Sequence, residues 1–380
     1  MANTLTDLIP NVYAALDVVS RELVGALPGV SRDSTADRLA TGQTIRSSVA
    51  PANTTATYTP SMGVPSAIDQ TISNVPFTLS KNKYAGFSWT GEEEYAVNQG
   101  GGALSIQQDQ IAQAFRVLVN EMEGDVCDAL ALGASRAYGT AGTTPFASSL
   151  ADSAQAKKIL DDNGAPPTGR CMVIDTSAGA SLRTLTQLTN VNQAGTEMTL
   201  RDGELLNLHG FSLKESAQIN NQTAGAMAGA DVNGATAKGA TTIPFDGGTV
   251  NATGIVAGDI LTIDGHKYVV VTGSTSTSGN LVIAAPGAVA AIADDSTITV
   301  NATSARNLAF SSNALTLATR LPIFPSQGDL AIDSEIITDP RTGINFDLRV
   351  YPGDGMVLYR IHALWGWAVQ KPEHAAIMLG

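Results

Sequence analysis

One uninterrupted amphipathic run constrains the fold of this chain more than any other feature. Between residues 105 and 137, apolar side chains recur at steps of three and four: Ile111, Phe115, Leu118, Met122, Val126 and Leu130. About 30 residues without a proline form a single helix of roughly 45 Å, and Ser105 can cap its start. A helix of this length braced by strands makes a rigid plate, which is the body that we expect.

The N-terminal region is expected to contribute a helix and an arm. Residues 10–26 place apolar side chains on one face, with Pro10 near the first turn of the predicted helix. Residues 31–65 are polar and rich in Ser, Thr, Ala and Pro. Because a compact domain has no need of so long a structureless stretch, this segment is interpreted as an extended arm.

A long β-hairpin is predicted over residues 66–97. Apolar residues alternate on both sides of the basic segment 80–83: Val75, Phe77 and Leu79 before it, and Ala85, Phe87 and Trp89 after it. Alternation of this kind is typical of strands with one buried face, so the basic segment is expected to be the tip of the hairpin.

Charged residues of this hairpin are the candidate inter-subunit contacts. Lys81 and Lys83 at the tip could meet an acidic surface on a neighbouring chain, although an ordinary soluble turn explains them as well. Glu92, Glu93 and Glu94 favour a solvated charge run at the end of the hairpin over paired catalytic carboxylates.

An α/β body is predicted after the long helix. Over residues 150–217 a helix (SAQAKKILDDNG), a buried strand (RCMVIDT), a second helix (SAGASLRTLTQL) and a bent strand or strand pair (GELLNLHGFSLKES) follow one another. Residues 305–319 have helix-compatible apolar spacing. Two long strands, Ile344–Tyr351 and Met356–Val369, are expected to close the chain around the turn PGDG.

A compositional island interrupts this body at residues 220–303. It is rich in Gly, Ala and Thr and lacks a helical period, and its predicted strands are short and evenly spaced: Thr241–Phe245, Asp259–Asp264, His266–Thr272, Asn280–Ala285 and Thr297–Asn301. This spacing indicates a small all-β barrel or sandwich. Because the body resumes afterwards, the island is an insertion rather than a terminal domain.

The stretch GIVAGDILTIDGHKYVVV (254–271) raises the question of a metal or acid–base site, since it gathers Asp259, Asp264 and His266. Two β-runs flank Asp264 and Gly265, and Asp-Gly is a strong hairpin signal because a tight turn needs positive φ angles. The stretch is therefore interpreted as a hairpin with Asp264 and Gly265 as its turn. His266 opens the returning strand and has no need to meet Asp259.

Composition and missing motifs argue against an enzyme. A net charge of −13 would repel nucleic acid on most faces. Walker A, Gly-x-Gly-x-x-Gly, Gly-x-Ser-x-Gly and His-Glu-x-x-His motifs are absent, the four histidines are scattered, and Cys127 and Cys171 are expected to be buried free thiols. We predict no catalytic, cofactor-binding or metal-binding residue, and no apolar run approaches the roughly 18 residues that a membrane span needs.

Three stretches carry a resemblance to a known family. They are DGELLNLHGFSLKES (202–216), GIVAGDILTIDGHKYVVV (254–271), and ARNLAFSSNALTLATRLP (305–322) with the block DPRTGINFDLRVYPGDGMVLYRIHALWGWAVQKPEHAAIML (339–379). Together with the order of the predicted elements, they resemble the major capsid proteins of tailed double-stranded DNA phages with the Hong Kong 97-type fold, in particular the coat protein family of the short-tailed phage P twenty-two.

The resemblance implies an α+β capsid fold with an inserted, barrel-like all-β domain. Its parts would be an N-terminal helix and arm (1–65), an extended β-hairpin loop (66–100), a peripheral domain with the spine helix (101–150), an axial α/β domain (151–219), the inserted β domain (220–303), and a return to the axial domain followed by peripheral strands (304–380). Some relatives crosslink subunits through a Lys–Asn isopeptide; Lys81, Asn82 and Lys83 offer the nucleophile, but the sequence identifies no partner.

The same resemblance implies a structural protein without enzymatic activity. It would assemble as hexamers and pentamers, with a separate scaffolding protein and a portal, into an icosahedral shell in the cytoplasm of a host bacterium. The shell would enclose double-stranded DNA without reading its sequence, would expand as the DNA enters, and would become the virion capsid. An acidic inner wall suits containment, because it leaves the packaged DNA free to exit.

Two alternatives remain at this point. An encapsulin-type nanocompartment shares the fold and encloses cargo protein; the inserted β domain argues against it, and the content of purified shells discriminates the two. A secreted β-rich adhesin or binding protein would instead be a stable monomer; the long helix and the missing signal segment argue against that class.

Overall fold

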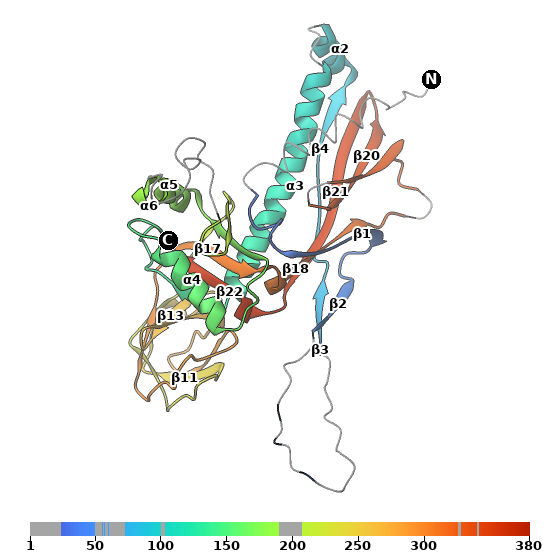
Figure 1. Ribbon diagram of the computed structural model, residues 1–380. Coiled ribbons are helices and arrows are strands. Elements are labelled where there is room, and N and C mark those ends of the chain that lie inside the picture. Colours follow the sequence, from blue (N-terminus) through green and yellow to red (C-terminus); the bar gives the residue numbers. More distant parts are fainter. Residues whose placement is uncertain are drawn as a thin grey trace.

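The chain folds into two halves of different shape (Figure 1). The computed structural model describes residues 24–49, 55, 57, 60, 73–99, 103–189, 207–325, 328–339 and 342–380. We call the elongated part, helix α3 with a six-stranded sheet, the helix–sheet half, and the other part, with α4, α5 and α6 on a second sheet, the compact half. The fold is mixed α+β with mostly strands.

Helix α3 (Ala103–Gly133) is the axis of the helix–sheet half. It spans 31 residues, so the prediction of one long helix is confirmed. The predicted apolar stripe is its packed face, because all six of its residues are buried: Ile111, Phe115, Leu118, Met122, Val126 and Leu130.

The six-stranded sheet has two open margins. Its strands are β4 (Lys81–Thr90), β21 (Met356–Val369), β20 (Asn345–Gly353), β19 (Asp333–Thr338), β18 (Leu315–Pro322) and β1 (Ser31–Leu39). β21 pairs with β4 along one side and with β20 and β18 along the other, while β19 pairs with β20 and β1 with β18. Among the described strands, none pairs further with β4 on one side or with β19 and β1 on the other, so backbone groups along both margins have no strand partner there.

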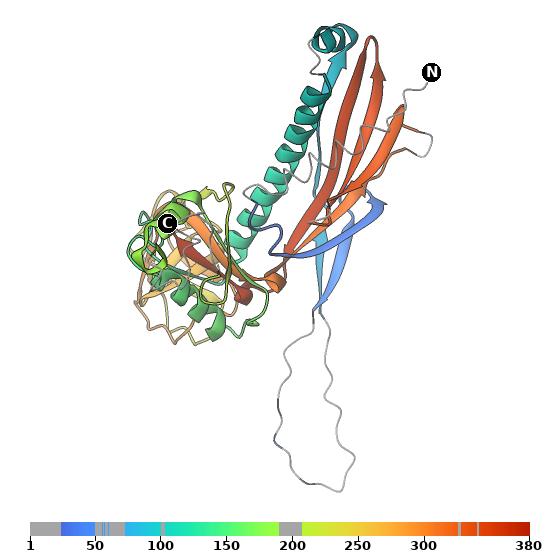
Figure 2. The ribbon, with the colours of Figure 1, turned by 45° about the horizontal axis from the view of Figure 1, so that its top comes forward.

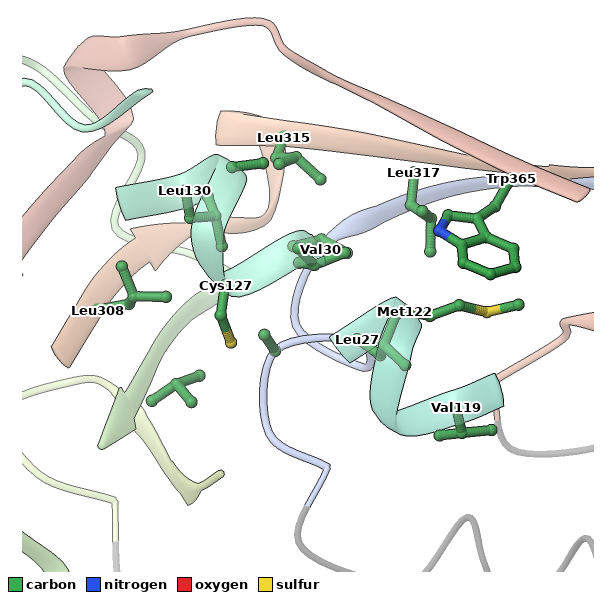
Figure 3. Packing of buried hydrophobic residues seen from close by; sticks show 14 of the residues in the cluster. Leu27, Val30, Val119, Met122, Cys127, Leu130, Leu308, Leu315, Leu317 and Trp365 are labelled. Atoms are coloured by element: carbon green, nitrogen blue, oxygen red, sulfur yellow. The ribbon is translucent and has the colours of Figure 1, made fainter. Parts of the chain in front are cut away.

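The core of the helix–sheet half lies between α3 and this sheet. Alternate residues of β21 face the helix, and Trp365 is fully buried beside Met122 and Leu317 (Figure 3). The Trp365 indole Nε1 donates a hydrogen bond to Asp125 Oδ2 at 2.9 Å. Apolar packing and a satisfied indole therefore fix the helix on the strand.

The predicted hairpin over residues 66–97 is wrong in its pairing. Strand β3 (Ser73–Thr78) pairs with β2 (Thr44–Val49), whereas β4 pairs with β21 in the C-terminal region. Figures 1 and 2 show the β2–β3 ribbon extending beyond the end of the six-stranded sheet. Alternation was a correct sign of strands, but it defines which face is buried and not which strand is the neighbour.

The N-terminal expectations are only partly covered by the described residues. The predicted helix 10–26 lies almost entirely outside them, and residues 24–26 are not helical. The segment 31–65, expected to be an arm, contributes strands β1 and β2 where it is described. β1 pairs in parallel with β18, so this segment is built into the sheet margin.

The compact half mostly follows the predicted alternation of helix and strand. Its elements are β5 (Arg136–Tyr138), α4 (Ala151–Asp162), β6 (Arg170–Ile174), α5 (Thr176–Thr184), α6 (Thr186–Thr189), β7 (Ser212–Glu215), β8 (Asn221–Gln222), β17 (Ser304–Ser311), the 3-10 turns η2 (Ser312–Ala314) and η3 (Pro372–His374), and β22 (Ala375–Leu379). The helix-compatible reading of residues 305–319 is wrong, because they form β17, η2 and the start of β18. Both faces of β17 and β18 are buried, which removes the alternation that would have identified strands.

Six strands of the segment 220–303 pair in a closed circle, which we call the β ring. They are β10 (Ala230–Val232), β11 (Thr242–Asp246), β15 (Gly279–Ile283), β14 (His266–Thr272), β13 (Ile260–Ile263) and β16 (Thr297–Val300), and β16 pairs back to β10. β9 (Ala226–Ala228) and β12 (Thr249–Gly254) form a separate pair. The ring has its own apolar core and joins the body through the pairing of β14 with β5.

Candidate functional site

The two candidate lysines lie on strand β4 and face helix α3. Lys81 Nζ is 3.6 Å from Glu121 Oε1 and 3.5 Å from Asp125 Oδ1, and Lys83 Nζ is 3.5 Å from Glu121 Oε1. The lysine side chains remain 35% and 49% exposed, respectively. Exposed pairs of this kind contribute at most about 1 kcal/mol each. The lysines therefore brace the edge strand within the chain and still present positive charge at the sheet margin.

The three candidate glutamates begin helix α2 (Gly91–Gln99) instead of ending a hairpin. Thr90 and Glu93 form a reciprocal capping box: the Thr90 amide donates to Glu93 Oε2 at 2.9 Å, and the Glu93 amide donates to Thr90 Oγ1 at 3.3 Å. Hydrogen bonds from Thr90, first from its backbone, lower the pKa of Glu93. Glu92 and Glu94 are exposed beside it, where negative charge suits a helix N-terminus.

Asp264 and Gly265 form the two-residue turn between β13 and β14. Ile263 pairs with His266 across the turn, and the φ angles of Asp264 and Gly265 are 47° and 78°. Positive φ at both positions is the signature of a type I′ hairpin. His266 is exposed at the start of β14.

Asp259 directly precedes β13, at the opposite end of this strand from the turn, and it is fully buried. Its carboxylate accepts hydrogen bonds from the Gly225 amide at 2.9 Å and the Val256 amide at 2.7 Å. Burial raises the pKa of Asp259 and lowers the pKa of nearby Arg306 to about 10. Asp259 is thus a structural acceptor that joins the loop before β13 to the segment that leads into β9, and it does not form a site with Asp264 and His266.

Glu123 is a contact that the sequence analysis missed. This fully buried glutamate of α3 accepts hydrogen bonds from the amides of Gly25, Ala26 and Leu27 at 2.8, 2.7 and 2.8 Å. Three donors converging on one carboxylate fix the N-terminal segment against the middle of the helix. The available signal was Glu123 itself, a charge placed among the apolar positions of the packed face.

A polar cluster on the sheet face away from α3 was also missed. Asp347 Oδ2 accepts from Arg38 Nη1 at 2.6 Å and from Arg349 Nε at 3.1 Å, and the Arg349 guanidinium lies 3.4 Å from the centre of the Phe324 ring. Arg349 also donates to Asp329 Oδ2 at 2.6 Å. The cluster joins β1, β20 and the β18–β19 connection, so it sets the shape of the margin that ends in β19.

An apolar groove runs between β4 and the flank of α3. It has a volume of about 380 Å³, and its lining includes Phe87, Ile106, Ala114 and Val117. Ile106 and Val117 are 42% and 57% exposed, respectively. A groove this apolar beside an unpaired strand edge is suited to contact with protein.

The described histidines and cysteines lie in separate parts of the fold. No three His, Cys, Asp or Glu side chains among the described residues are grouped so that they could hold a metal ion. The histidines belong to separate elements; His209 Nδ1 is 2.8 Å from Ser153 Oγ, and His362 lies between the rings of Tyr84 and Phe324. Cys127 and Cys171 are buried free thiols, and burial raises the pKa of Cys171 to about 11. No described helix is long and apolar enough to cross a membrane.

No protein-family model and no curated protein matches the sequence, whereas several solved structures are similar to it over most of its length. A chain from Mycobacterium phage Che8 is 14% identical with a TM-score of 0.47, over 89% of this chain and 84% of that one. A chain of the capsid of cyanophage P-SCSP1u is 12% identical (TM-score 0.48, 92% and 86%). A chain of the virus-like particle from Pyrococcus furiosus is 10% identical (TM-score 0.44, 98% and 100%).

Proposed function

We propose that this chain is a major capsid protein that assembles into a closed shell. The observation that carries the proposal is the open architecture of the helix–sheet half. Two strand margins, an apolar groove along α3 and a ribbon of two strands beyond the sheet all present surface that the described part of the chain does not cover. Other copies of the same chain would cover these surfaces, and many weak contacts of this kind sum to a stable assembly.

We assign the parts by the resemblance of the sequence to the Hong Kong 97-type family. The helix–sheet half would be the peripheral domain with its spine helix, the compact half the axial domain, and the β ring the inserted domain of the P twenty-two-like proteins. The β2–β3 ribbon would take the place of the extended loop that the sequence alone had put at residues 66–100, with its tip at 80–83. The domain limits at 65, 100, 150, 219 and 303 are part of this proposal.

The proposed assembly consists of hexamers and pentamers in an icosahedral shell around double-stranded DNA. A scaffolding protein and a portal would be the other partners, and assembly would take place in the cytoplasm of a host bacterium. The net charge of −13 supports containment without tight binding of the DNA.

The test is assembly of the full chain, expressed with and without a candidate scaffolding protein and examined by electron microscopy and sedimentation velocity. We expect closed shells of uniform size. Shells purified from infected cells should contain DNA; shells filled with a cargo protein would instead identify an encapsulin-type compartment. A chain that stays monomeric under all conditions would refute the proposal and favour a binding protein.

A further inference from the structure

The two open margins of the six-stranded sheet carry opposite charges on the same face. On β19, Ile337 packs into the core beneath α3, so Asp333 and Glu335, at alternate positions, share the helix side of the sheet. On β4, Lys81 and Lys83 occupy that same side, as their ion pairs with α3 show. An acidic edge therefore stands at one margin and a basic edge at the other.

Exposed aliphatic side chains gather at the acidic margin. Ile323, Leu330, Ile332 and Ile336, all from the β18–β19 connection or β19 itself, are 60%, 87%, 66% and 42% exposed. Four such side chains within 14 positions are more than scattered surface residues explain.

Leu330 is the most unusual of them, because its backbone has a φ of 65°. This left-handed conformation costs a residue other than glycine about 1–2 kcal/mol. A large apolar side chain held in this way and turned to solvent has no role within the chain that the described contacts reveal, which points to a role against another surface.

The direction of the strands allows the two margins to join. β19 is antiparallel to β20, β20 to β21, and β21 to β4, so β19 and β4 run in opposite directions within one chain. A second copy in the same orientation therefore brings its β19 alongside β4 as an antiparallel neighbour, with the helix sides of both sheets aligned. The unpaired backbone groups of both edges would then find partners.

We infer that β19 of one copy pairs with β4 of the next and extends the sheet from subunit to subunit. Glu335 would lie opposite Lys83 on the helix side, and Ile336 would lie near Tyr84, which is 58% exposed on the other side. The contact uses two different surfaces, so it is head-to-tail, and it closes into a ring when each copy is rotated by a constant angle relative to its neighbour. It deepens the proposed shell function, on which it rests, by naming the contact that joins neighbouring copies within one ring.

A charge exchange tests the pairing. Glu335→Lys and Lys83→Glu should each raise the subunit concentration needed for assembly about tenfold, because each places like charges opposite one another. The double exchange should restore assembly to within about threefold of the unchanged chain. Asp354→Lys, at the exposed β20–β21 turn beyond the residues of β4 that the pairing uses, makes the same charge change as Glu335→Lys and should leave assembly unaltered. Thermal unfolding of each variant separates assembly from folding.

Leu330→Asn tests the apolar part of the contact without harming the fold. Asparagine tolerates a positive φ, so the variant should unfold at the same or a higher temperature while it assembles less readily. The edge pairing is refuted if the single exchanges and Leu330→Asn all assemble like the unchanged chain, or if the double exchange does not restore assembly. In either case, formation of shells by the unchanged chain still supports the proposed function. If the unchanged chain never assembles, both proposals fall.

Discussion

The β ring and the six-stranded sheet differ in whether their strand edges are paired. A strand edge exposes unpaired amides and carbonyls, and the ring removes its edges by closing on itself around a core that includes Phe245 and Tyr268. The six-stranded sheet leaves two margins open and keeps aliphatic side chains exposed beside one of them. The closed β ring therefore serves the stability of the single chain, whereas the open six-stranded sheet keeps surfaces for contact with other chains.

The two regions also differ in how they use charge. In the ring, the Asp259 carboxylate accepts hydrogen bonds from two amides. In the helix–sheet half, Glu123 and the cluster around Asp347 hold together segments that are far apart in sequence.

The three tryptophans of the chain, Trp89, Trp365 and Trp367, all lie in the helix–sheet half, so tryptophan fluorescence reports on that half alone. This allows the stability of the two regions to be measured separately.

The largest effect is expected from Phe245→Ala in the ring. Phe245 is 1% exposed in the ring core, and the resulting cavity should lower the free energy of unfolding of the ring by about 3–5 kcal/mol. Hydrogen exchange followed by mass spectrometry should show that the amides of β10–β16 lose protection. The unfolding transition measured by tryptophan fluorescence should change little. Val271→Ala, at an exposed site of the same ring, should have almost no effect. A matching drop in the tryptophan transition after Phe245→Ala would mean that ring and sheet unfold as one unit.

Glu123→Ala should destabilise the helix–sheet half by about 3 kcal/mol, because it leaves three buried amides without an acceptor. Urea unfolding followed by tryptophan fluorescence measures this loss in the free energy of unfolding. Glu121→Ala is the matched control, two residues away in the same helix; it removes only exposed ion pairs and should cost less than about 1 kcal/mol. Equal losses in the two variants would show that the N-terminal segment is not held by Glu123.

Two glycines should respond to alanine with opposite signs. A Cβ meets no atom within 4 Å at either Gly265 or Gly124. Gly265 has a φ of 78°, so Gly265→Ala should cost the ring about 1–2 kcal/mol. Gly124 lies inside α3, where Gly124→Ala should stabilise the helix–sheet half by about 0.5–1 kcal/mol. Thermal unfolding decides the signs, and a stabilised Gly265→Ala would contradict the assigned turn.

The smallest effect concerns pH and His362. Burial lowers the pKa of His362 in the folded state, so the unfolded chain binds the proton more readily. The contribution of His362 to stability is fully present above about pH 6.5 and declines as the pH falls toward the lower folded-state pKa. His362→Gln should flatten this part of the pH profile of the tryptophan transition, whereas His266→Gln at the exposed ring turn should not. An unchanged profile in His362→Gln would assign the pH dependence to other groups.

Part of the candidate site could be anticipated from the sequence. The strand character of residues 81–90 and the Asp264–Gly265 turn follow from alternation and from turn chemistry, which act over a few residues. The position of Lys81 and Lys83 could not be anticipated, because it depends on β21, whose partner residues lie more than 270 positions away. Glu123 was visible as a charge on an apolar face, but its partners at Gly25–Leu27 were not.

The sequence by itself determined where the long helix runs, which of its faces is buried, and the extended character of the alternating segments. These properties are local, because the backbone fixes periods of 3.6 and two residues wherever apolar side chains repeat. Only the tertiary structure decided that β3 pairs with β2 and β4 with β21, that residues 304–322 are strands, and that one sheet closes while the other stays open. Strand partners are chosen by long-range burial and by the order in which chain ends meet, and no short stretch of sequence carries that information.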